Sequence, residues 1–328
     1  MTEPEPGFTR EQLEAAILGA APDLTSDEVA RASGFSVDDT RRFWRALGFA
    51  DAGAQVAFTD GDVKALALIG ALVEEGAVDE ETVLRMTRAV GHTISRLAEW
   101  EVATLVGRVE QLEAGNQATG SRIGSALRLA ELIGPSFEEL LLYSWRRHLA
   151  AAVARVEALG ANDENLRTAE VTIGFADLVG FSAYSNQHTQ DEIGETVEVF
   201  ENRCSDAVAQ RRGRVIKTLG DSVLFVCGEA ARAYDVAEDI VRQIGADHEL
   251  PDVRVGLATG PVVLRLGDVF GPAVNLAARM TSVARRNRVI VDQRTAALLP
   301  VGDFVTRVLP ARPVRGFGDV EPVAVRRR

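Results

Sequence analysis

The chain has 328 residues, enough for two domains of ordinary size that each bury a core. Apolar residues make up 46% of it and charged residues 26%, which is typical of a globular protein and excludes a disordered chain. The formal net charge of −12 argues against a broad nucleic-acid-binding surface, because such a surface needs clustered positive charge.

Two features predict where the protein is found. No charged leader followed by an apolar core opens the chain, and the most apolar run, ALALIGALVEEG from Ala65, is too short to cross a bilayer. Cys204 and Cys227 form no CxxC pair, and we interpret them as buried thiols in a reducing compartment. We therefore expect a cytoplasmic protein without stable membrane insertion.

Residues 1–159 show the three-to-four-residue apolar period of helices, and we expect an all-helical domain there. Asp79 is predicted to cap a helix whose first turn contains Glu80 and Glu81. One apolar face of that helix is formed by Val83, Met86, Val90, Ile94, Leu97 and Leu105. Further helices are predicted in EQLEAAILGA, GDVKALALIGALVEEG and SFEELLLYSWRRHLAAAVARVEAL.

Residues 24–49, LTSDEVARASGFSVDDTRRFWRALGF, are spaced like the helix-turn-helix of MerR-like regulators, with VDDTRRFWRAL as the second helix. In this stretch Asp27, Glu28, Asp38 and Asp39 balance the arginines, whereas a groove-reading unit carries excess positive charge. We therefore favour a helical packing module over a DNA reader, and we do not expect nucleic acid as a partner.

A polar stretch, GANDENLRT at residues 160–168, is predicted to be a linker. Residues 169–328 then alternate between strands and helices: strand EVTIGFADL, helix QDEIGETVEVFENRCSDAVAQRRG, hairpin RVIKTLGDSVLFVC and helix EAARAYDVAEDIVRQIG. DVRVGLATGPVVLRLGD is expected to give two more strands, GPAVNLAARMTSVARR a helix, and the remainder short strands. This order predicts an α+β fold of the ferredoxin-like βαββαβ type, with a mostly antiparallel sheet and helices on one face.

Two aspartates stand at strand ends in this half. Asp221 follows Gly220 in the hairpin turn of KTLGDSVLFV, where turn chemistry alone accounts for the Gly-Asp pair. Asp177 ends the first strand, in GFADLVGFSAY, and strands adjacent in sequence usually neighbour one another. If the two carboxylates converge, their oxygens would suit Mg²⁺ or Mn²⁺, a pair of which can activate a hydroxyl for phosphoryl-type displacement.

Four other polar residues sharpen this interpretation. Lys217 lies four residues before Asp221, and Asp268 follows a strand in LRLGDVFGPAV. Asn275 and Arg279 are four apart on the next predicted helix and hence share a face. An Arg and an Asn presented together can hold a pentavalent phosphate and a ribose oxygen, although a solvated helix face also explains this pair taken alone.

Five stretches together resemble the successive motifs of the class III nucleotidyl cyclases: FADLVGFSAYS, GRVIKTLGDSVLFV, VRVGLATGPV, GDVFGPAVNLAARM and VRGFGDVEPV. The similarity covers residues 170–325, about half the chain, with order and spacing kept. The resemblance implies that Asp177 and Asp221 bind two Mg²⁺ or Mn²⁺ ions per site. It implies also that Lys217 and Asp268 read the purine.

The resemblance assigns roles to three further residues. Asn275 matches the family's ribose-orienting asparagine, and Arg279 matches the arginine that stabilises the α-phosphate. Arg315, in VRGFG, stands where the family commonly has a triphosphate-binding lysine. Arginine keeps the charge and adds a bidentate fork, so we carry Arg315 over as a phosphate contact that departs from the family pattern. A surface arginine in a Gly-flanked turn is the alternative.

The family's sites form between two such domains arranged head to tail, which implies a homodimer with two equivalent sites. The metal aspartates come from one chain, and the other four residues come from its partner. The implied reaction is attack of the ribose 3′-hydroxyl of ATP on the α-phosphorus, giving 3′,5′-cyclic AMP and pyrophosphate. No side chain in the set is an evident general base, so catalysis would rest on positioning and charge stabilisation.

The purine is predicted from hydrogen-bond chemistry. Adenine offers an N6 donor and an N1 acceptor, which suit the carboxylate of Asp268 and the ammonium of Lys217. Guanine presents the reverse, for which an acceptor such as glutamate would be wanted at position 217. ATP is therefore favoured over GTP, because a mismatched buried polar pair costs several kcal/mol.

The layout of a helical half before one cyclase domain is similar to that of soluble actinobacterial cyclases, whose N-terminal half regulates catalysis, often in response to pH. His92 and His148 lie on predicted helices of this half, and histidine titrates near neutrality. Structural histidines are the simpler explanation of both. The apolar helices could also enclose a lipid-like ligand, although an ordinary core or a dimer interface suits them better.

The leading prediction is thus a homodimeric adenylate cyclase regulated by its helical half. A guanylate cyclase is the alternative within the same class. A non-catalytic nucleotide-sensing or DNA-binding regulator that kept the fold is the alternative from another class. Residues 24–49 favour that third reading, and the presence of all six reactive residues opposes it.

Overall fold

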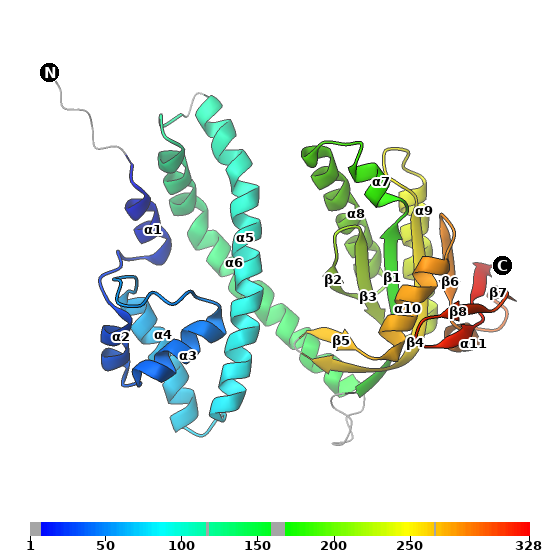
Figure 1. Cartoon of the computed structure of the whole chain (residues 1–328), viewed down its shortest axis with the longest axis horizontal. Coiled ribbons are helices and arrows are strands. Elements are labelled where there is room, and N and C mark those ends of the chain that lie inside the picture. The colour runs from blue at the N-terminus through cyan, green and yellow to red at the C-terminus, as the bar shows by residue number, and fades with distance from the viewer. Residues whose placement is uncertain (1–7, 116–117, 159–167, 266) are drawn as a thin grey trace. The chain divides into compact units, whose positions relative to one another are not determined.

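The computed structural model describes residues 8–115, 118–158, 168–265 and 267–328 (Figure 1). The chain forms two compact units, Met1–Ala152 and Val153–Arg328, and the division falls inside one long helix. The linker predicted at residues 160–168 lies outside the described residues, apart from its last residue. Among the helices of the described ranges, none combines the length and apolar character needed to span a membrane.

The first unit is helical, as predicted. Its helices are α1 (Arg10–Leu18), α2 (Ser26–Ser33), α3 (Val37–Leu47), α4 (Asp60–Glu74), α5 (Glu80–Ala114) and α6 (Arg122–Ala158). The predicted cap of α5 is confirmed, since the Asp79 side chain accepts a hydrogen bond from the Thr82 amide. Threonine and a partner three residues on form capping boxes at α1, α2 and α4, which explains why these short helices begin where they do.

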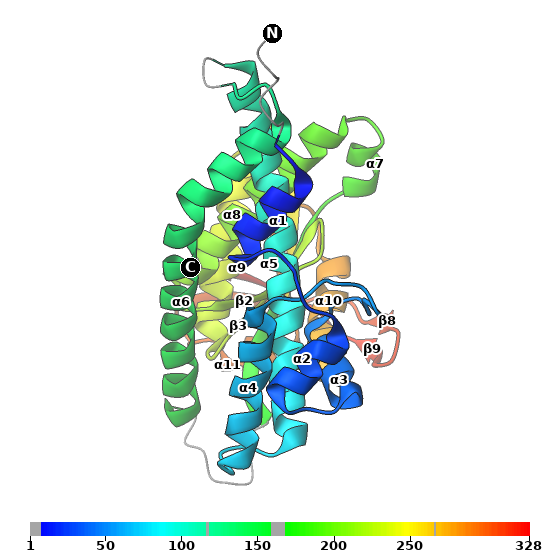
Figure 2. The same cartoon turned by 90° about the vertical axis from the view of Figure 1, so that its left-hand side faces the viewer.

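The core of this unit lies where α2, α3 and α4 gather against the first turns of α5 (Figure 2). Phe43 and Trp44 of α3 are buried there, and the Trp44 ring stacks on Phe58 with centroids 5.5 Å apart. The second helix of the helix-turn-helix thus packs against α5. This packing fits the helical-module interpretation of residues 24–49.

Two features of the long helices differ from the prediction. On α5 only the start of the predicted apolar face is buried, because Val83 is 4% exposed whereas Met86 is 57% and Val90 is 54% exposed. Helix α6 begins at Arg122, well before the predicted stretch, and runs through Pro135. A proline normally marks the end of a predicted helix, because it lacks a backbone N–H and clashes with the preceding turn. The prediction therefore began after Pro135, and the turns of α6 before it were missed.

The second unit holds the sheet. Its strands are β1 (Thr168–Leu178), β2 (Arg214–Thr218), β3 (Ser222–Cys227), β4 (Val253–Arg265), β5 (Asp268–Phe270), β6 (Arg288–Val291), β7 (Phe304–Val308), β8 (Arg312–Val314), β9 (Gly318–Val320) and β10 (Val323–Arg327). Its helices are α7 (Phe181–Ser185), α8 (Gln190–Gln210), α9 (Ala230–Gly245), α10 (Pro272–Val283) and α11 (Gln293–Leu298). Among these, α7 and α11 were not predicted.

The main sheet has the order β2-β3-β1-β4-β6-β10-β7, with β5 paired to β4. The segment β2-β3-β1-β4 with α8 and α9 is the predicted ferredoxin-like βαββαβ arrangement. Every pairing is antiparallel except β4 with β6. Strand β1 lies between β3 and β4, so residues at its end have a neighbour on both sides.

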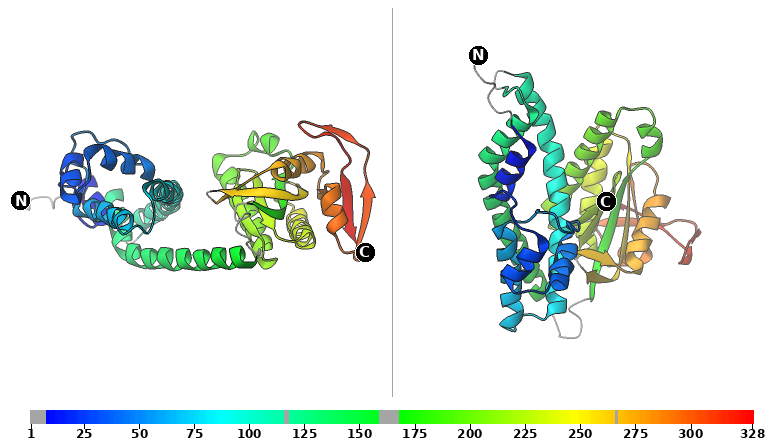
Figure 3. Two further views of the ribbon diagram at one scale, coloured as in Figure 1. Left: turned by 90° about the horizontal axis from the view of Figure 1, so that it is seen from below. Right: turned by 60° about the vertical axis from the view of Figure 1, so that its left-hand side comes forward.

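Helices cover both faces of this sheet, which corrects the expectation of one covered face (Figure 3). Helices α8 and α9 pack on the face that holds Phe225 and Val255. Helix α10 packs on the opposite face, against Ile173 and Leu224. Alternation along a strand separates these two sets, and the α10 face is the one that concerns the candidate site.

A close approach fixes α10 on the sheet. Gly256 of β4 leaves no room for a side chain, since an added Cβ would lie 2.1 Å from the Thr281 amide nitrogen and 2.6 Å from the Ala277 carbonyl oxygen. Thr281 Oγ1 also lies 3.2 Å from the carbonyl oxygen of Phe175 on β1. The backbone of α10 is therefore set directly on the two central strands.

Candidate active site

Asp177 lies near the end of β1, opposite Ser222 of β3 and Arg254 of β4. Its Oδ1 accepts a hydrogen bond from Ser222 Oγ at 2.5 Å, and its Oδ2 accepts one from Arg254 Nε at 2.7 Å. The side chain is 18% exposed, so these charge-assisted bonds act in a partly desolvated place. Both neighbouring strands thus orient this carboxylate.

Asp221 occupies the turn between β2 and β3, after Gly220, whose φ of +68° requires glycine. Its carbonyl oxygen accepts a hydrogen bond from the Leu178 amide at 3.0 Å, which ties the turn to the end of β1. Burial, and then the charge of Asp177, raises the pKa of the Asp221 carboxyl. The predicted convergence of the two aspartates at one sheet edge is therefore present in the structure.

This donor set fits a divalent cation. Two carboxylates that repel one another at a partly buried edge are stabilised by positive charge between them, and all-oxygen donors suit Mg²⁺ or Mn²⁺. Arg254 supplies part of that positive charge in the structure. The described residues contain no group of three or more acidic, His or Cys side chains placed to hold a metal, so the remaining ligands would come from substrate and water.

Lys217 and Asp268 form an ion pair, with Lys217 Nζ 2.6 Å from Asp268 Oδ2. Burial alone would raise the pKa of Asp268, but the hydrogen bonds from Lys217 and from the Val269 amide outweigh it, and the pKa is lowered. Asp268 is thus held as a carboxylate beside an ammonium group. The structure brings together these two residues, which lie on β2 and β5.

Asn275 and Arg279 project from α10, and both are exposed. They lie four residues apart and so occupy one side of the helix. In the described part of the chain, neither side chain has a hydrogen-bond or ion-pair partner that would hold it in place. Because α10 is set closely on β1 and β4, the helix presents both groups from a rigid support.

Arg315 is exposed in the turn between β8 and β9. Val314 beside it is buried against Met280 of α10 and Ile290 of β6. The hairpin is therefore packed on the end of the helix that carries Asn275 and Arg279.

The strand register places Lys217 and Asp177 on one face of the sheet. Lys217 pairs with Leu224, Leu224 pairs with Phe175, and Phe175 is two residues before Asp177. Residues opposite one another, and residues two apart, project from the same side of a sheet. Lys217, Asp177 and Arg254 therefore all belong to the α10 face.

Arg254 and Ser222 were missed by the sequence reasoning. An arginine inside DVRVGLATG, an otherwise apolar central strand, is a usable signal, because buried strands seldom carry a charge without a partner. Ser222 carried no such signal, since serine after a Gly-Asp turn is common. Only the register shows that both residues flank Asp177.

Comparison with known proteins decides the family. Residues 164–325 match the adenylate and guanylate cyclase catalytic domain. An adenylate cyclase of Streptomyces coelicolor is 39% identical to this chain, over 97% of the chain and 89% of the relative. An adenylate cyclase of Streptomyces griseus is 42% identical, over 86% of the chain and 69% of the relative. The chain belongs to the adenylate and guanylate cyclase family. The resemblance drawn from the five motifs is thereby confirmed.

A pH-sensitive adenylate cyclase of Mycobacterium tuberculosis is also similar to this cyclase, at 29% identity over 98% of the chain and 86% of the relative. These relatives align along almost the whole chain, so the similarity includes the helical unit as well as the sheet unit. The roles of the seven candidate site residues are not tested by these comparisons and stay predictions.

Exchange of Asp221 for asparagine should separate metal binding from folding. In metal-free solution Asp221→Asn should leave the melting temperature unchanged or raise it, because it removes a charge that burial and Asp177 disfavour. Mn²⁺ at 100 times its Kd stabilises a one-site protein by about 2.7 kcal/mol, and the variant should lose this gain. Thermal unfolding with and without Mn²⁺ measures both effects.

The matched control is Asp206→Asn, which removes an exposed carboxylate of α8. This variant should keep the full Mn²⁺ gain. The same gain in Asp221→Asn would remove Asp221 from the metal site. Asp177→Ala is less informative, because it leaves the partly buried Arg254 without its carboxylate.

Proposed function

We propose that this cyclase converts ATP to 3′,5′-cyclic AMP and pyrophosphate. The observation that carries the proposal is the Lys217–Asp268 pair, an ammonium donor 2.6 Å from a carboxylate acceptor. Lys217 belongs to the sheet face that also bears Asp177. Adenine offers the complementary acceptor and donor at N1 and N6. The adenylate cyclases among its relatives support the same substrate.

The residues divide the work as follows. Lys217 and Asp268 orient the base, Asn275 orients the ribose, and Arg279 and Arg315 neutralise charge on the phosphates. Arg254 orients the side chain of Asp177, and the carboxylates of Asp177 and Asp221 lie close enough to interact through their charges. Two divalent cations bound to these carboxylates would neutralise the triphosphate and lower the pKa of the ribose 3′-hydroxyl.

The base preference is tested by comparing ATP with GTP in the presence of Mn²⁺. We expect kcat/KM for ATP to exceed that for GTP by about 100-fold or more, since a mismatched buried polar pair costs several kcal/mol. Lys217→Glu should reduce that ratio by at least about tenfold, because glutamate accepts where lysine donates. Product formation is measured by chromatography of the cyclic nucleotides.

Lys64→Glu is the matched control, because it makes the same charge change on α4 of the helical unit. It should leave the ATP-to-GTP ratio unchanged. A wild-type preference for GTP would overturn the assignment of Lys217 and Asp268 and favour a guanylate cyclase.

We propose further that the active form is a homodimer whose two sites each combine residues of both chains. Exposed apolar residues lie next to the base-reading pair along the chain: Leu219, two residues after Lys217, is 51% exposed, and Phe270, two residues after Asp268, is 51% exposed. A second copy of the chain packed against this end of the sheet unit would cover them. The metal aspartates of one chain would then meet Lys217 and Arg279 of the other.

Mixing two inactive variants tests this arrangement. Asp221→Asn disables the metal side of a site and Arg279→Ala disables the phosphate side, so each alone should be nearly inactive. A heterodimer of the two holds one site with both defects and one intact site. Equal mixing should restore about a quarter of wild-type activity, because half of the dimers carry one intact site of two.

The control mixture combines Asp221→Asn with Asp177→Asn. Both changes lie on the metal side, so every site of that heterodimer is defective and no activity should return. Equal recovery in both mixtures, or none in either, would contradict the shared site.

We propose that the helical unit regulates catalysis and that pH is the stimulus. The support is the relative named as pH-sensitive, which aligns with 98% of this chain, and the presence of His92 and His148 on α5 and α6. Both histidines are exposed. The packing of α3 against α5 favours a regulatory helical module over a DNA reader.

Removal of residues 1–152 tests this role. The remaining unit, Val153–Arg328, is compact and contains every candidate site residue. Its rate of cyclic AMP formation from pH 5 to 8 should differ from that of the full chain in level or in profile. A profile that is unchanged, in a truncated protein with a cooperative melting transition, would leave the helical unit without the proposed role.

We also propose a cytoplasmic location, because neither cysteine forms a disulfide. Cys204 and Cys227 are both free and buried. Burial raises the pKa of the Cys227 thiol to about 12, which makes it an inert core side chain. Free buried thiols are typical of reducing compartments.

A further inference from the structure

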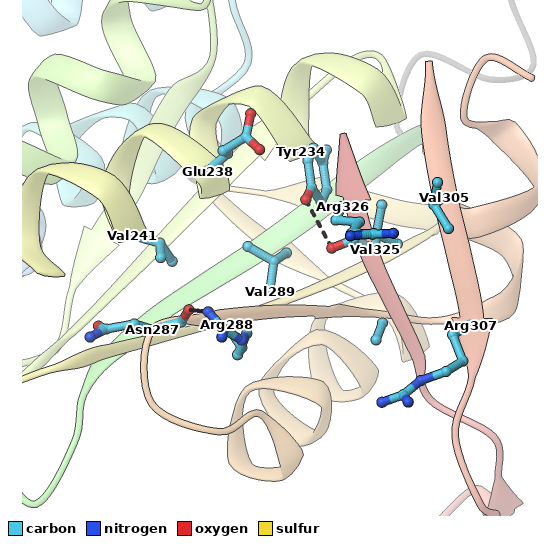
Figure 4. A pocket seen from close by; sticks show the side chains of 11 residues that line it. Tyr234, Glu238, Val241, Asn287, Arg288, Val289, Val305, Arg307, Val325 and Arg326 are labelled. Atoms are coloured by element: carbon cyan, nitrogen blue, oxygen red, sulfur yellow. Dashed lines mark hydrogen bonds between the residues drawn. The ribbon is translucent and has the colours of Figure 1, made fainter. Parts of the chain in front are cut away.

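A cavity of about 630 Å³ opens in the sheet unit between α9 and the strands β6, β10 and β7 (Figure 4). Tyr234 and Val289, which line it, belong to the core on the α9 face of the sheet. Ala324, which also lines the cavity, packs on the other side of the sheet with Met280 of α10, so the cavity lies in the gap between β6 and β10. None of the seven candidate site residues lines it, and the cavity is therefore separate from the candidate active site. No proposed catalytic step uses this space.

The cavity exists because two strands separate. β10 pairs with β6 only at Val323–Val291 and Ala324–Ile290, whereas it pairs with β7 as far as Arg327. In the described ladder, the register does not continue to Val325 and Val289. The Tyr234 hydroxyl donates to the Val325 carbonyl oxygen at 2.9 Å in place of a strand partner (Figure 4).

Three arginines, Arg288, Arg307 and Arg326, line the opening, and all three are exposed. Within the described ranges none of them is ion-paired with a carboxylate, and Arg288 donates only to the carbonyl oxygen of Asn287, at 2.9 Å. The lining carboxylate, Glu238, is already paired with Arg327 at 2.9 Å. The opening therefore carries uncompensated positive charge in a chain whose net charge is −12.

Part of the cavity lining is apolar. Val241 of α9 and Val289, Val305 and Val325 of the strands line it, and the hydroxyl of Tyr234 is already bonded. A hydrated inorganic anion at the arginines would leave these side chains uncovered. A ligand that joins an anionic group to an apolar body would satisfy both parts of the lining.

We propose that this cavity binds an organic phosphate. The phosphate group lies among Arg288, Arg307 and Arg326, and the apolar portion covers the valines. Guanidinium groups bind phosphate oxygens in bidentate fashion, and a dianion matches several arginines better than a carboxylate does. A nucleoside monophosphate and a lipid-like alkyl phosphate share this chemistry. The site goes beyond the proposed cyclase reaction and does not depend on it.

Calorimetric titration of the full-length protein with hexyl phosphate, in metal-free buffer containing a chelator, tests the site. Saturable binding is expected, and Arg307→Gln with Arg326→Gln should weaken it at least about tenfold through loss of two charge-assisted contacts. Arg285→Gln with Arg312→Gln is the matched control, because both are exposed arginines of the same unit outside the cavity. The control should bind as the wild type does.

A change in the cavity interior gives a second measurement. Val241→Ser should weaken hexyl phosphate but leave the affinity for inorganic phosphate unchanged, since only the first covers the valines. Adenosine monophosphate distinguishes the two sources. If adenosine monophosphate binds more tightly than hexyl phosphate, and the Arg307/Arg326 double variant loses this binding, the ligand is a nucleotide. If hexyl phosphate binds more tightly, the ligand is lipid-like.

Two results would overturn the proposal. One is the absence of saturable binding of either organic phosphate to the wild type up to about 10 mM. The other is an equal loss of affinity in the control pair, which would show attraction to surface charge alone. Neither readout involves cyclic nucleotide formation, so failure here is distinguishable from failure of the proposed cyclase function.

Discussion

The central interaction of the sheet unit is the pair of hydrogen bonds that Ser222 and Arg254 donate to the carboxylate of Asp177, one from each neighbouring strand. It requires β1 to lie between β3 and β4 in a register that places all three residues in one row. The same register brings the Asp221 turn to the end of β1. A partly buried charge without partners would be costly, so this arrangement both stabilises the edge and concentrates negative charge for a cation.

The second constraint is the closeness of α10 to the sheet. Gly256 allows the backbone of the helix to lie on β4, and Thr281 links it to β1. The exposed Asn275 and Arg279 are thereby carried on a support that packs like a protein core. Val314 attaches the hairpin of Arg315 to the same helix. These exposed side chains are thus presented from closely packed backbone positions.

The two faces of the sheet have different chemistry. The α10 face carries the candidate site residues Asp177 and Lys217 together with Arg254. The α9 face is a packed core that is interrupted where β10 leaves β6, and the arginine-lined cavity occupies that gap. Because the two strands separate only at one end of the sheet, the proposed organic phosphate can bind there without disturbing the central strands that carry the candidate site residues.

Short-range patterns in the sequence determined most of the helices, the βαββαβ order, the Asp79 cap and the motifs around Asp177, Asp221 and Asn275, because periodicity, caps and turns depend on neighbouring residues. Only the tertiary structure decided that Lys217 pairs with Asp268 at 2.6 Å, that Arg254 flanks Asp177, and that α10 lies on the opposite face from α9. It also showed that only the start of the predicted α5 apolar face is buried. Strand register, the side of a sheet and the burial of a face depend on contacts between distant segments, which no local pattern specifies.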